Sequence, residues 1–451
     1  MSTTARFVRS QEGKQTERPL TYTGSPLLLF ASDIRLFFRN ILYLPFIFLP
    51  LYPWLSGPMD ELYPSPANLT DIAFHCVLFV AQLGFLTSLP FLIYLPVWLY
   101  LLYIATVLGL NALVCLHFNK GIPEGGLKST EDEYSRQWAP HDDEYWIFLN
   151  GICVGRNWLQ SNIDRLSRGF HRPVVGVHNT TNGVVFDLVQ CLVQRAFLYA
   201  TSDIRDCYVL VKRAIYRPGI KKVVLILHSQ GGIEGGMMLD WLLDEIPQSL
   251  LQYLEVYTFG CLANHFSNPS RDTAPKRIHE RAISHIEHYA NAYDFASRWG
   301  VLNFTRVRPE NRLENRFMGR VFVNPRPGHQ LNQHYLDSIF PLGPTRRFTR
   351  DPEKGDFMDM DASVEAENRW IEEDKQVSSL SSSRLTDGLE GESNSGRRNV
   401  VPRGGMLRGT PTNNAGIHTR TGTCSNHNFG TPKMWELSRL WQYRNGGRPS
   451  T

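Results

Sequence analysis

The sequence predicts an α/β domain built on a mostly parallel sheet and preceded by a membrane region. Over residues 144–349, short apolar runs rich in β-forming residues alternate with segments of helical periodicity. Strands joined through helices in this way form βαβ units, whose strands run parallel. Residues 72–118 contain no Asp, Glu, Lys or Arg, and this run far exceeds the roughly 20 residues that a membrane-spanning helix needs.

Each predicted element follows from a local pattern of apolar residues bounded by Gly, Pro, Asn or Asp. The predicted strands cover 144–149, 173–177, 222–227, 254–259, 284–290 and 320–323. The predicted helices cover 157–166, 186–198, 202–216, 235–243 and 334–339. Composition divides the rest into a disordered basic tail (1–23), a membrane region (24–118), a linker (119–143) and a disordered low-complexity tail (350–451) with a short helix near 435–443.

The membrane region is expected to hold two or three transmembrane or re-entrant segments. Residues 72–118 divide near Pro90, and residues 36–55 are apolar but contain Pro45, Pro50 and Pro53, so that they form either a bent span or an interfacial segment. The N-terminal tail carries four basic residues, which favours a cytoplasmic N-terminus. Two spans return the α/β domain to the cytoplasm, whereas three place it in the lumen. The region is expected to act as a tether, or else to pack over the site and form part of its pocket.

Charge and cysteine content exclude several classes of function. The formal net charge of +4 is small for 451 residues, and no basic run interleaved with aromatic residues indicates a nucleic-acid partner. The seven cysteines are scattered and odd in number, which predicts neither a disulfide framework nor a zinc site. No metal or cofactor is expected.

One strand ends in a motif typical of a nucleophilic serine. The apolar run 222–227 leads into His228, Ser229 and Gln230, followed by two glycines. A nucleophile elbow needs such a strand, a sharp turn that exposes the hydroxyl and a helix that begins directly behind it. Leu227 departs from the usual G-x-S-x-G pattern, because it stands where the first glycine is expected.

A serine nucleophile needs a histidine base and a carboxylate, which follow an elbow of this type in the order Ser, acid, His. Asp294 follows the predicted strand 284–290, and His329 lies in a Gly-Pro-rich loop after the last strand. We therefore predict Ser229, Asp294 and His329 as catalytic residues. The rivals are Asp240, Asp244 and Asp337 for the acid and His334 for the base, all on predicted helices.

The oxyanion hole is expected to combine backbone N–H groups from two loops. One is the N–H of Gln230, directly after the nucleophile, and the other comes from Gly151 or Ile152, after the first strand of the domain. The side chain of Asn150 is equally well explained as an ordinary turn residue.

The elbow and the later Gly-His loop resemble the α/β-hydrolase superfamily over residues 145–340, and in particular lipase-like hydrolases that fungi attach to membranes. The resemblance implies a central sheet of about eight strands and cofactor-independent esterase or lipase chemistry. We therefore expect a membrane-anchored serine hydrolase that cleaves a lipid-like carboxylic ester at a bilayer. The alternative is a catalytically silent fold that serves as a membrane-bound binding or scaffold protein.

Overall fold

The computed structural model describes residues 5–10, 25–51, 57–271, 281–305, 317–343, 357–364 and 431–449. It contains one mixed sheet of nine strands in the order β2-β4-β3-β5-β6-β7-β8-β1-β9. The strands are β1 (Arg6–Val8), β2 (Leu127–Lys128), β3 (Glu144–Leu149), β4 (Val174–Val177), β5 (Lys222–His228), β6 (Leu254–Phe259), β7 (His285–Asn291), β8 (Arg320–Asn324) and β9 (Ser363–Val364). The six strands from β4 to β8 in this order are parallel, which confirms the predicted α/β class.

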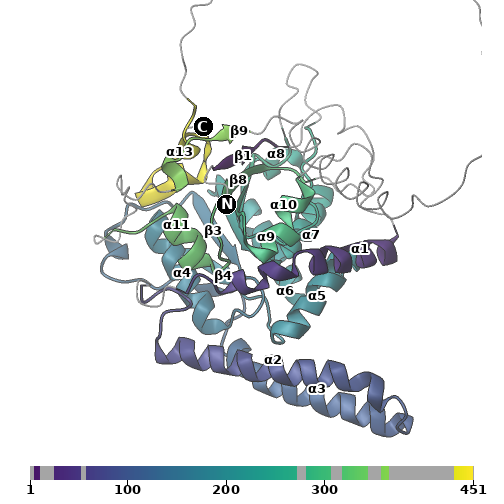
Figure 1. The fold of residues 1–451 in the computed structure, drawn as a ribbon. Coiled ribbons are helices and arrows are strands. Elements are labelled where there is room, and N and C mark those ends of the chain that lie inside the picture. Colours follow the sequence, from purple (N-terminus) through teal and green to yellow (C-terminus); the bar gives the residue numbers. More distant parts are fainter. Residues whose placement is uncertain are drawn as a thin grey trace, which may run out of the picture. The chain divides into compact units, whose positions relative to one another are not determined.

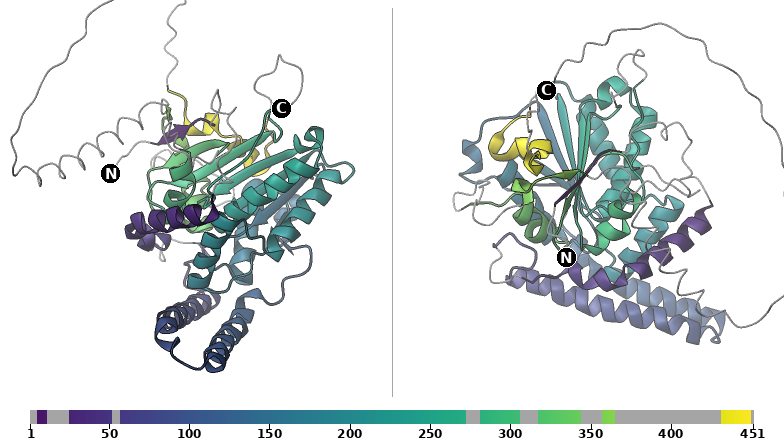
Figure 2. Two further views of the ribbon diagram at one scale, coloured as in Figure 1. Left: turned by 90° about the vertical axis from the view of Figure 1, so that its right-hand side faces the viewer. Right: turned by 45° about the horizontal axis from the view of Figure 1, so that its top comes forward.

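Helices cover both faces of the sheet (Figures 1 and 2). Helices α6 (Ser202–Tyr216), α7 (Gln230–Glu245) and α9 (Phe295–Trp299) share one hydrophobic core with alternate residues of the strands. Helix α4 (Arg156–Phe170), the π-helix η5 (Leu331–Leu336) and α11 (Asp337–Ile339) share a second core with the remaining strand residues. Because successive side chains of a strand point to opposite faces, a sheet covered on both sides needs apolar residues throughout its strands. This requirement explains the continuous apolar runs.

The remaining helices connect these layers. They are α5 (Val184–Phe197), α8 (Gln248–Leu251), α10 (Val301–Phe304), and the short 3₁₀ segments η4 (Ser135–Gln137) and η6 (Phe357–Asp359). Helix α7 begins five residues before the predicted helix 235–243, directly after Ser229. The predicted helix 334–339 is divided between η5 and α11.

Three segments predicted as tail or linker belong to the sheet. Strand β1, from the supposed basic tail 1–23, pairs antiparallel with β8, and β9, from the supposed tail 350–451, pairs with β1. Strand β2, from the linker 119–143, pairs antiparallel with β4. These strands have two or three residues each, too few to show a period, which is why the sequence did not reveal them.

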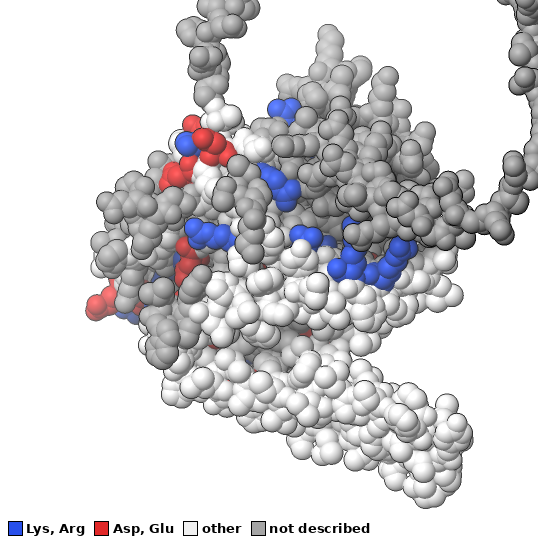
Figure 3. Space-filling model, viewed as in Figure 1, with Lys and Arg blue, Asp and Glu red and all other residues white. Residues whose placement is uncertain are grey.

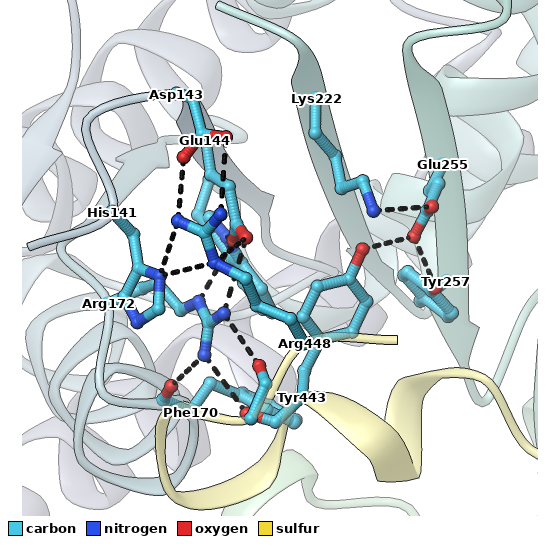
Figure 4. A network of polar contacts seen from close by, with 12 residues as sticks. His141, Asp143, Glu144, Phe170, Arg172, Lys222, Glu255, Tyr257, Tyr443 and Arg448 are labelled. Atoms are coloured by element: carbon cyan, nitrogen blue, oxygen red, sulfur yellow. Dashed lines mark hydrogen bonds and ion pairs between the residues drawn. The ribbon is translucent and has the colours of Figure 1, made fainter. Parts of the chain in front are cut away.

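The C-terminal segment 431–449 also folds onto the domain, so the prediction of a disordered tail is wrong there. It forms α13 (Met434–Leu437) and the 3₁₀ segment η7 (Leu440–Gly446), close to the helix expected at 435–443. Tyr443 is fully buried and its hydroxyl donates to Glu255, while the buried Arg172 donates to the carbonyl oxygens of Tyr443 and Gly447 (Figure 4). We call residues 431–449 the C-terminal clasp. The predicted disorder of residues 365–430 lies outside the described residues.

Within the described part of the chain, two helices are long and apolar enough to cross a membrane, α2 (Pro66–Leu92) and α3 (Val97–Asn119). They form a hairpin, and the face of it seen in Figure 3 carries no charged side chain. Phe91 and Tyr94 at its tip are 80% and 92% exposed. A third span arises only if the bent pair α5 and α6 counts as one, and both of these helices contribute buried residues to the first core.

The other expected segment, 36–55, is described as far as residue 51 and forms no long helix over that part. Helix α1 (Pro26–Arg39) ends within this range, and the 3₁₀ segment η3 (Ile41–Ile47) with Pro45 inside it follows. Asp33 of α1 forms a buried ion pair of 2.9 Å with Arg195 of α5. Helix α1 is therefore attached to the α/β domain, and its apolar residues Leu27, Leu28 and Phe38 remain exposed.

Candidate active site

The parallel strands end together at one edge of the sheet, and the predicted catalytic residues lie there. His228 at the end of β5 is in register with Phe259 at the end of β6, and Asn291 at the end of β7 with Asn324 at the end of β8. Ser229 follows β5, Asp294 follows β7, and His329 follows β8. The topology therefore brings together three residues that are up to 100 positions apart in the chain.

Ser229, His329 and Asp294 form a continuous chain of hydrogen bonds. The Ser229 hydroxyl lies 2.9 Å from Nε2 of His329, and Nδ1 of His329 lies 3.0 Å from Oδ2 of Asp294. Because the carboxylate can only accept, Nδ1 carries the proton, and Nε2 is left to accept from the serine hydroxyl. This is the tautomer that a general base acting on Ser229 requires.

The backbone of Ser229 is strained in the way a nucleophile elbow demands. Its φ of 55° and ψ of −119° lie in a region that residues other than glycine rarely adopt. The turn is tight because Gly231 packs against the end of β3, where a Cβ would come within 2.6 Å of the Leu149 carbonyl oxygen. Strain of this kind persists only where the surrounding structure enforces it, and it concentrates at functional sites.

The departure at Leu227 is accommodated by a glycine one turn into the next helix. Leu227 is fully buried, and a Cβ on Gly235 of α7 would lie 2.2 Å from its Cδ1 atom. The leucine therefore occupies the space that a side chain at position 235 would fill. The contact between Leu227 and Gly235 falls behind the elbow and not at the Ser229 hydroxyl.

Asp294 is fixed by more partners than the sequence indicated. Its Oδ2 accepts from the hydroxyls of Tyr335 (2.7 Å) and Ser297 (2.9 Å) in addition to His329, and its side chain caps α9. Burial opposes ionisation, yet His329, Tyr335 and Ser297 together hold the pKa of the Asp294 carboxyl below its ordinary value. Asp294 is therefore an anion that accepts the Nδ1 proton of His329.

His228 is a further positioning residue that the sequence analysis missed. Its Nε2 donates to the carbonyl oxygen of His329 at 2.9 Å, and its ring stacks on that of His329 with centroids 4.8 Å apart. Burial, aided by the nearby His329, lowers the pKa of His228 to about 3, so that it stays neutral. Its place directly before the serine is the only signal in the sequence that pointed to it.

The predicted oxyanion loop lies beside the nucleophile. A Cβ on Gly151 would come within 2.4 Å of the Ser229 Cβ atom, so the loop can approach this closely only with glycine. Within the described residues, the backbone N–H groups of Gly151 and Ile152 donate no hydrogen bond. Together with the N–H of Gln230 at the start of α7, they are available to a ligand oxygen near Ser229.

Buried amides hold these donors in place. Asn150 donates to the Gly151 carbonyl oxygen and accepts from the N–H of Asn179. Asn179 in turn donates to the side chain of Gln230 at 2.7 Å, and Gln230 donates to Gln194 at 2.8 Å. Asn150 is thus a positioning residue and not an ordinary turn residue, and the side chain of Gln230 orients its own backbone.

The rival residues are engaged elsewhere. Asp240 pairs with His265 at 2.9 Å, Asp337 pairs with Arg165 at 3.0 Å, and Asp244 lies farther along α7. His334 donates to the Pro50 carbonyl oxygen and accepts from the N–H of Gln330. The structure thus brings together Ser229, Asp294 and His329 and leaves the rivals out. The search for clusters of potential metal ligands finds none among the described residues.

The α2–α3 hairpin is hydrogen-bonded to the loops that flank the site. His75 of α2 donates to the Cys153 carbonyl oxygen (2.9 Å), in the loop that carries Gly151. Gln82 of α2 and Asn111 of α3 both donate to the Asn182 carbonyl oxygen, at 2.6 and 3.0 Å, in the loop after β4. The hairpin is thus attached to the domain along one face, which a simple tether would not require.

Comparison with models of protein families, with curated proteins and with solved structures finds no match to this chain.

Proposed function

We propose that this protein is a membrane-anchored serine hydrolase of α/β-hydrolase type, which cleaves a carboxylic ester through an acyl-enzyme intermediate. The observation that carries the proposal is the Ser229–His329–Asp294 hydrogen-bond chain, with Ser229 strained at a strand-to-helix turn. The order of these residues, after β5, β7 and β8, is the order Ser, acid, His of α/β-hydrolases.

The residues divide the reaction between them. The Ser229 oxygen attacks the ester carbonyl carbon while its proton passes to Nε2 of His329, and Asp294 stabilises the resulting imidazolium. The N–H groups of Gln230 and of Gly151 or Ile152 stabilise the negative oxygen of the tetrahedral intermediate. His329 then returns the proton to the departing alcohol, and a water molecule activated by His329 releases the acid and restores Ser229. This sequence needs no cofactor.

A lipid-like ester is the substrate class that suits the surroundings. The hairpin α2–α3 is uncharged over 72–118, and we propose that it places the protein in the bilayer as an integral membrane protein. Its hydrogen bonds to the loops after β3 and β4 put the site close to that bilayer. An enzyme held there encounters membrane esters at a high effective concentration.

A fluorophosphonate probe tests the proposed nucleophile directly. The full chain in detergent is expected to be labelled at Ser229, and Ser229→Ala to remove the labelling. Hydrolysis of acyl esters of graded chain length then defines the substrate, with longer chains expected to be favoured. Labelling of the alanine variant at the wild-type level would assign the nucleophile elsewhere.

The closed state of the site favours one alternative, a catalytically silent scaffold. Ser229 is only 2% exposed and His329 only 6%, so that a substrate reaches them only after part of the cover moves. If the folded wild-type protein neither reacts with the probe nor hydrolyses any ester at a lipid surface, the scaffold function is the better explanation.

A further inference from the structure

A cleft of ≈ 890 Å³ lies at the end of the hairpin where α2 begins and α3 ends. Pro66, Ala67, Leu116 and Phe118 form its apolar wall. Its polar lining comes from both hairpin helices and from the start of α4, and includes Lys120 and Arg156. The cleft is separate from the Ser229 site, since none of the catalytic residues lines it.

Two cations at this cleft have no acidic partner within the described part of the chain. Lys120 follows α3, Arg156 is the first residue of α4, and both side chains are exposed. No ion pair joins either one to a described Asp or Glu. Gly121 permits Arg156 to lie against it, because a Cβ there would come within 2.8 Å of the guanidinium Nη1. The Arg156 guanidinium therefore lies beside the residue that follows Lys120, and both cations line the same cleft.

The first turn of α4 adds backbone donors beside these cations. Arg156, Asn157 and Gln160 line the cleft, and Gly155 at the N-cap provides no side-chain acceptor for the N–H groups of this turn. The N-terminal end of a helix of this length favours an anion through its free N–H groups and its dipole. The backbone N–H donors and the two cations thus both favour an anionic ligand.

The acidic residue in the cleft, Asp71, already accepts hydrogen bonds from two neighbouring side chains. Asp71 of α2 accepts from His117 through Oδ1 (2.9 Å) and from Asn157 through Oδ2 (3.1 Å). Its charge faces these two donors, and it contacts neither Lys120 nor Arg156. The net character of the cleft mouth is therefore positive.

We propose that this cleft binds the phosphodiester headgroup of an anionic phospholipid. The phosphate would lie between Lys120, Arg156 and the first turn of α4, and an acyl chain would follow the apolar wall. That wall continues into the exposed surface of the hairpin, where Leu69, Leu113 and Leu116 are 54%, 63% and 53% exposed. A free phosphate would use the cations but leave the apolar wall empty, so the lipid fits more of the cleft.

Lipids with ether-linked chains test this site without involving ester hydrolysis. The full chain in non-ionic detergent is titrated with short-chain diether phosphatidylglycerol, diether phosphatidylcholine and inorganic phosphate, and binding is measured by calorimetry. The diether phosphatidylglycerol is expected to bind about 30-fold more tightly than the diether phosphatidylcholine, because each of the two cations should add about 1 kcal/mol of binding free energy to an anionic headgroup. Lys120→Gln/Arg156→Gln should remove this difference.

A charge-matched control and a single variant keep the test decisive. Arg213→Gln/Arg217→Gln removes two exposed cations that precede the start of β5. This variant should keep the preference for phosphatidylglycerol over phosphatidylcholine. If the double variant at the cleft unfolds at a lower temperature, Lys120→Gln alone, whose side chain has no described partner, should still weaken binding of the glycerol lipid severalfold. Equal affinity for both headgroups, an unchanged preference in the cleft variants, or tight phosphate binding that the lipid does not displace would overturn the proposal.

Discussion

Apart from Asp294, the buried acids near the two ends of the parallel strands have pKa values shifted in opposite directions. At the edge where the strands end, burial and the neighbouring Asp203 raise the pKa of Glu234 far above its ordinary value, and burial raises that of Asp187 to about 6. At the edge where the strands begin, Glu255 and Glu287 are equally buried, yet neighbouring cations and hydroxyls hold their pKa values below the ordinary range against the effect of burial.

The difference lies in the partners that each edge supplies. Glu255 accepts from Arg439 at 2.9 Å and from the hydroxyls of Tyr257 and Tyr443, each at 2.7 Å, and it also pairs with Lys222 at 3.3 Å (Figure 4). Glu234 accepts from the amide of Gln194 at 3.2 Å and has a second acid, Asp203, as its other neighbour in place of a cation. Where the strands begin, the buried acids therefore have hydrogen-bond and ion-pair partners and stabilise the fold. Where the strands end, the structure retains backbone strain and unpaired polar atoms, at the place where a reaction would occur.

Ser229→Ala should have the largest effect on activity and a negligible one on stability. Loss of the nucleophile is expected to lower kcat roughly 10⁶-fold, while the rest of the edge keeps its contacts. Rates of ester hydrolysis test the effect on activity, and the thermal unfolding midpoint of the same preparation tests the effect on stability. A variant that unfolds early would show that Ser229 serves the fold as well.

Asp294→Asn should lower kcat by about 10⁴, because the amide cannot hold His329 in the required tautomer. Asp240→Asn is the matched control, since Asp240 is also buried in part but pairs with His265. Steady-state kinetics at several pH values distinguish the two. Comparable losses in both variants would remove Asp294 from its assigned role.

Arg172→Gln should have the largest effect on stability and a small one on the chemistry. Arg172 is 1% exposed, pairs with Glu144 at 2.9 Å and holds the C-terminal clasp through two carbonyl oxygens. Removing it takes the closest cation from the buried Glu144 carboxylate, which keeps only the more distant Arg448 at 3.8 Å, and this loss costs about 3–5 kcal/mol. Denaturant unfolding measures the loss, and Arg168→Gln, whose pair with Asp132 is partly exposed, should cost less than about 1 kcal/mol.

Gly235→Ala should destabilise the protein by about 1–3 kcal/mol, because the new methyl group meets Leu227. Leu227→Ala alone should cost about 2–5 kcal/mol through the cavity that it leaves. The double variant should lose less than the sum of the two, since each change makes room for the other. Additive losses in a double-mutant cycle would mean that Gly235 does not compensate for Leu227.

The sequence predicted the meeting of Ser229, Asp294 and His329 better than it predicted the residues that support them. Ser229, Asp294 and His329 follow strands that are visible as apolar runs, so that strand order alone brought them to one edge. Tyr335 and Asn179 lie in different loops and helices, and nothing local indicates that their side chains meet Asp294 and Gln230. Contacts of this kind depend on how distant segments pack.

The hairpin shows a signal that was present in the sequence but not used. Asn68, Asp71, His75 and Gln82 recur at helical spacing on one face of α2, and all are buried against the domain. A polar stripe on an apolar helix indicates a protein neighbour on that side, because lipid offers no hydrogen bonds. The C-terminal clasp carried no such signal, since its burial depends on pairing with strand residues nearly 200 positions away.

Asp60→Asn should leave the chemistry unchanged and have an effect on stability that appears only as the pH changes. Burial, together with the charges of Asp337 and Glu61, raises the pKa of Asp60 to about 8, far above its ordinary value. The folded protein therefore keeps a proton on Asp60 that the unfolded chain loses near pH 4. The stability that protonated Asp60 contributes is complete below that pH and is lost as the pH rises through about 8.

Wild type should lose up to about 1.4 kcal/mol of unfolding free energy per pH unit relative to the asparagine variant over this range. An amide keeps the acceptor for the Gly57 N–H, which lies 2.6 Å from Oδ2 of Asp60, so the variant should match wild type in acid and exceed it near pH 8. Urea unfolding from pH 5 to pH 9, with the exposed Asp142→Asn as control, measures this difference. Parallel curves for wild type and Asp60→Asn would mean that Asp60 is already ionised in the folded protein, as Glu255 and Glu287 are.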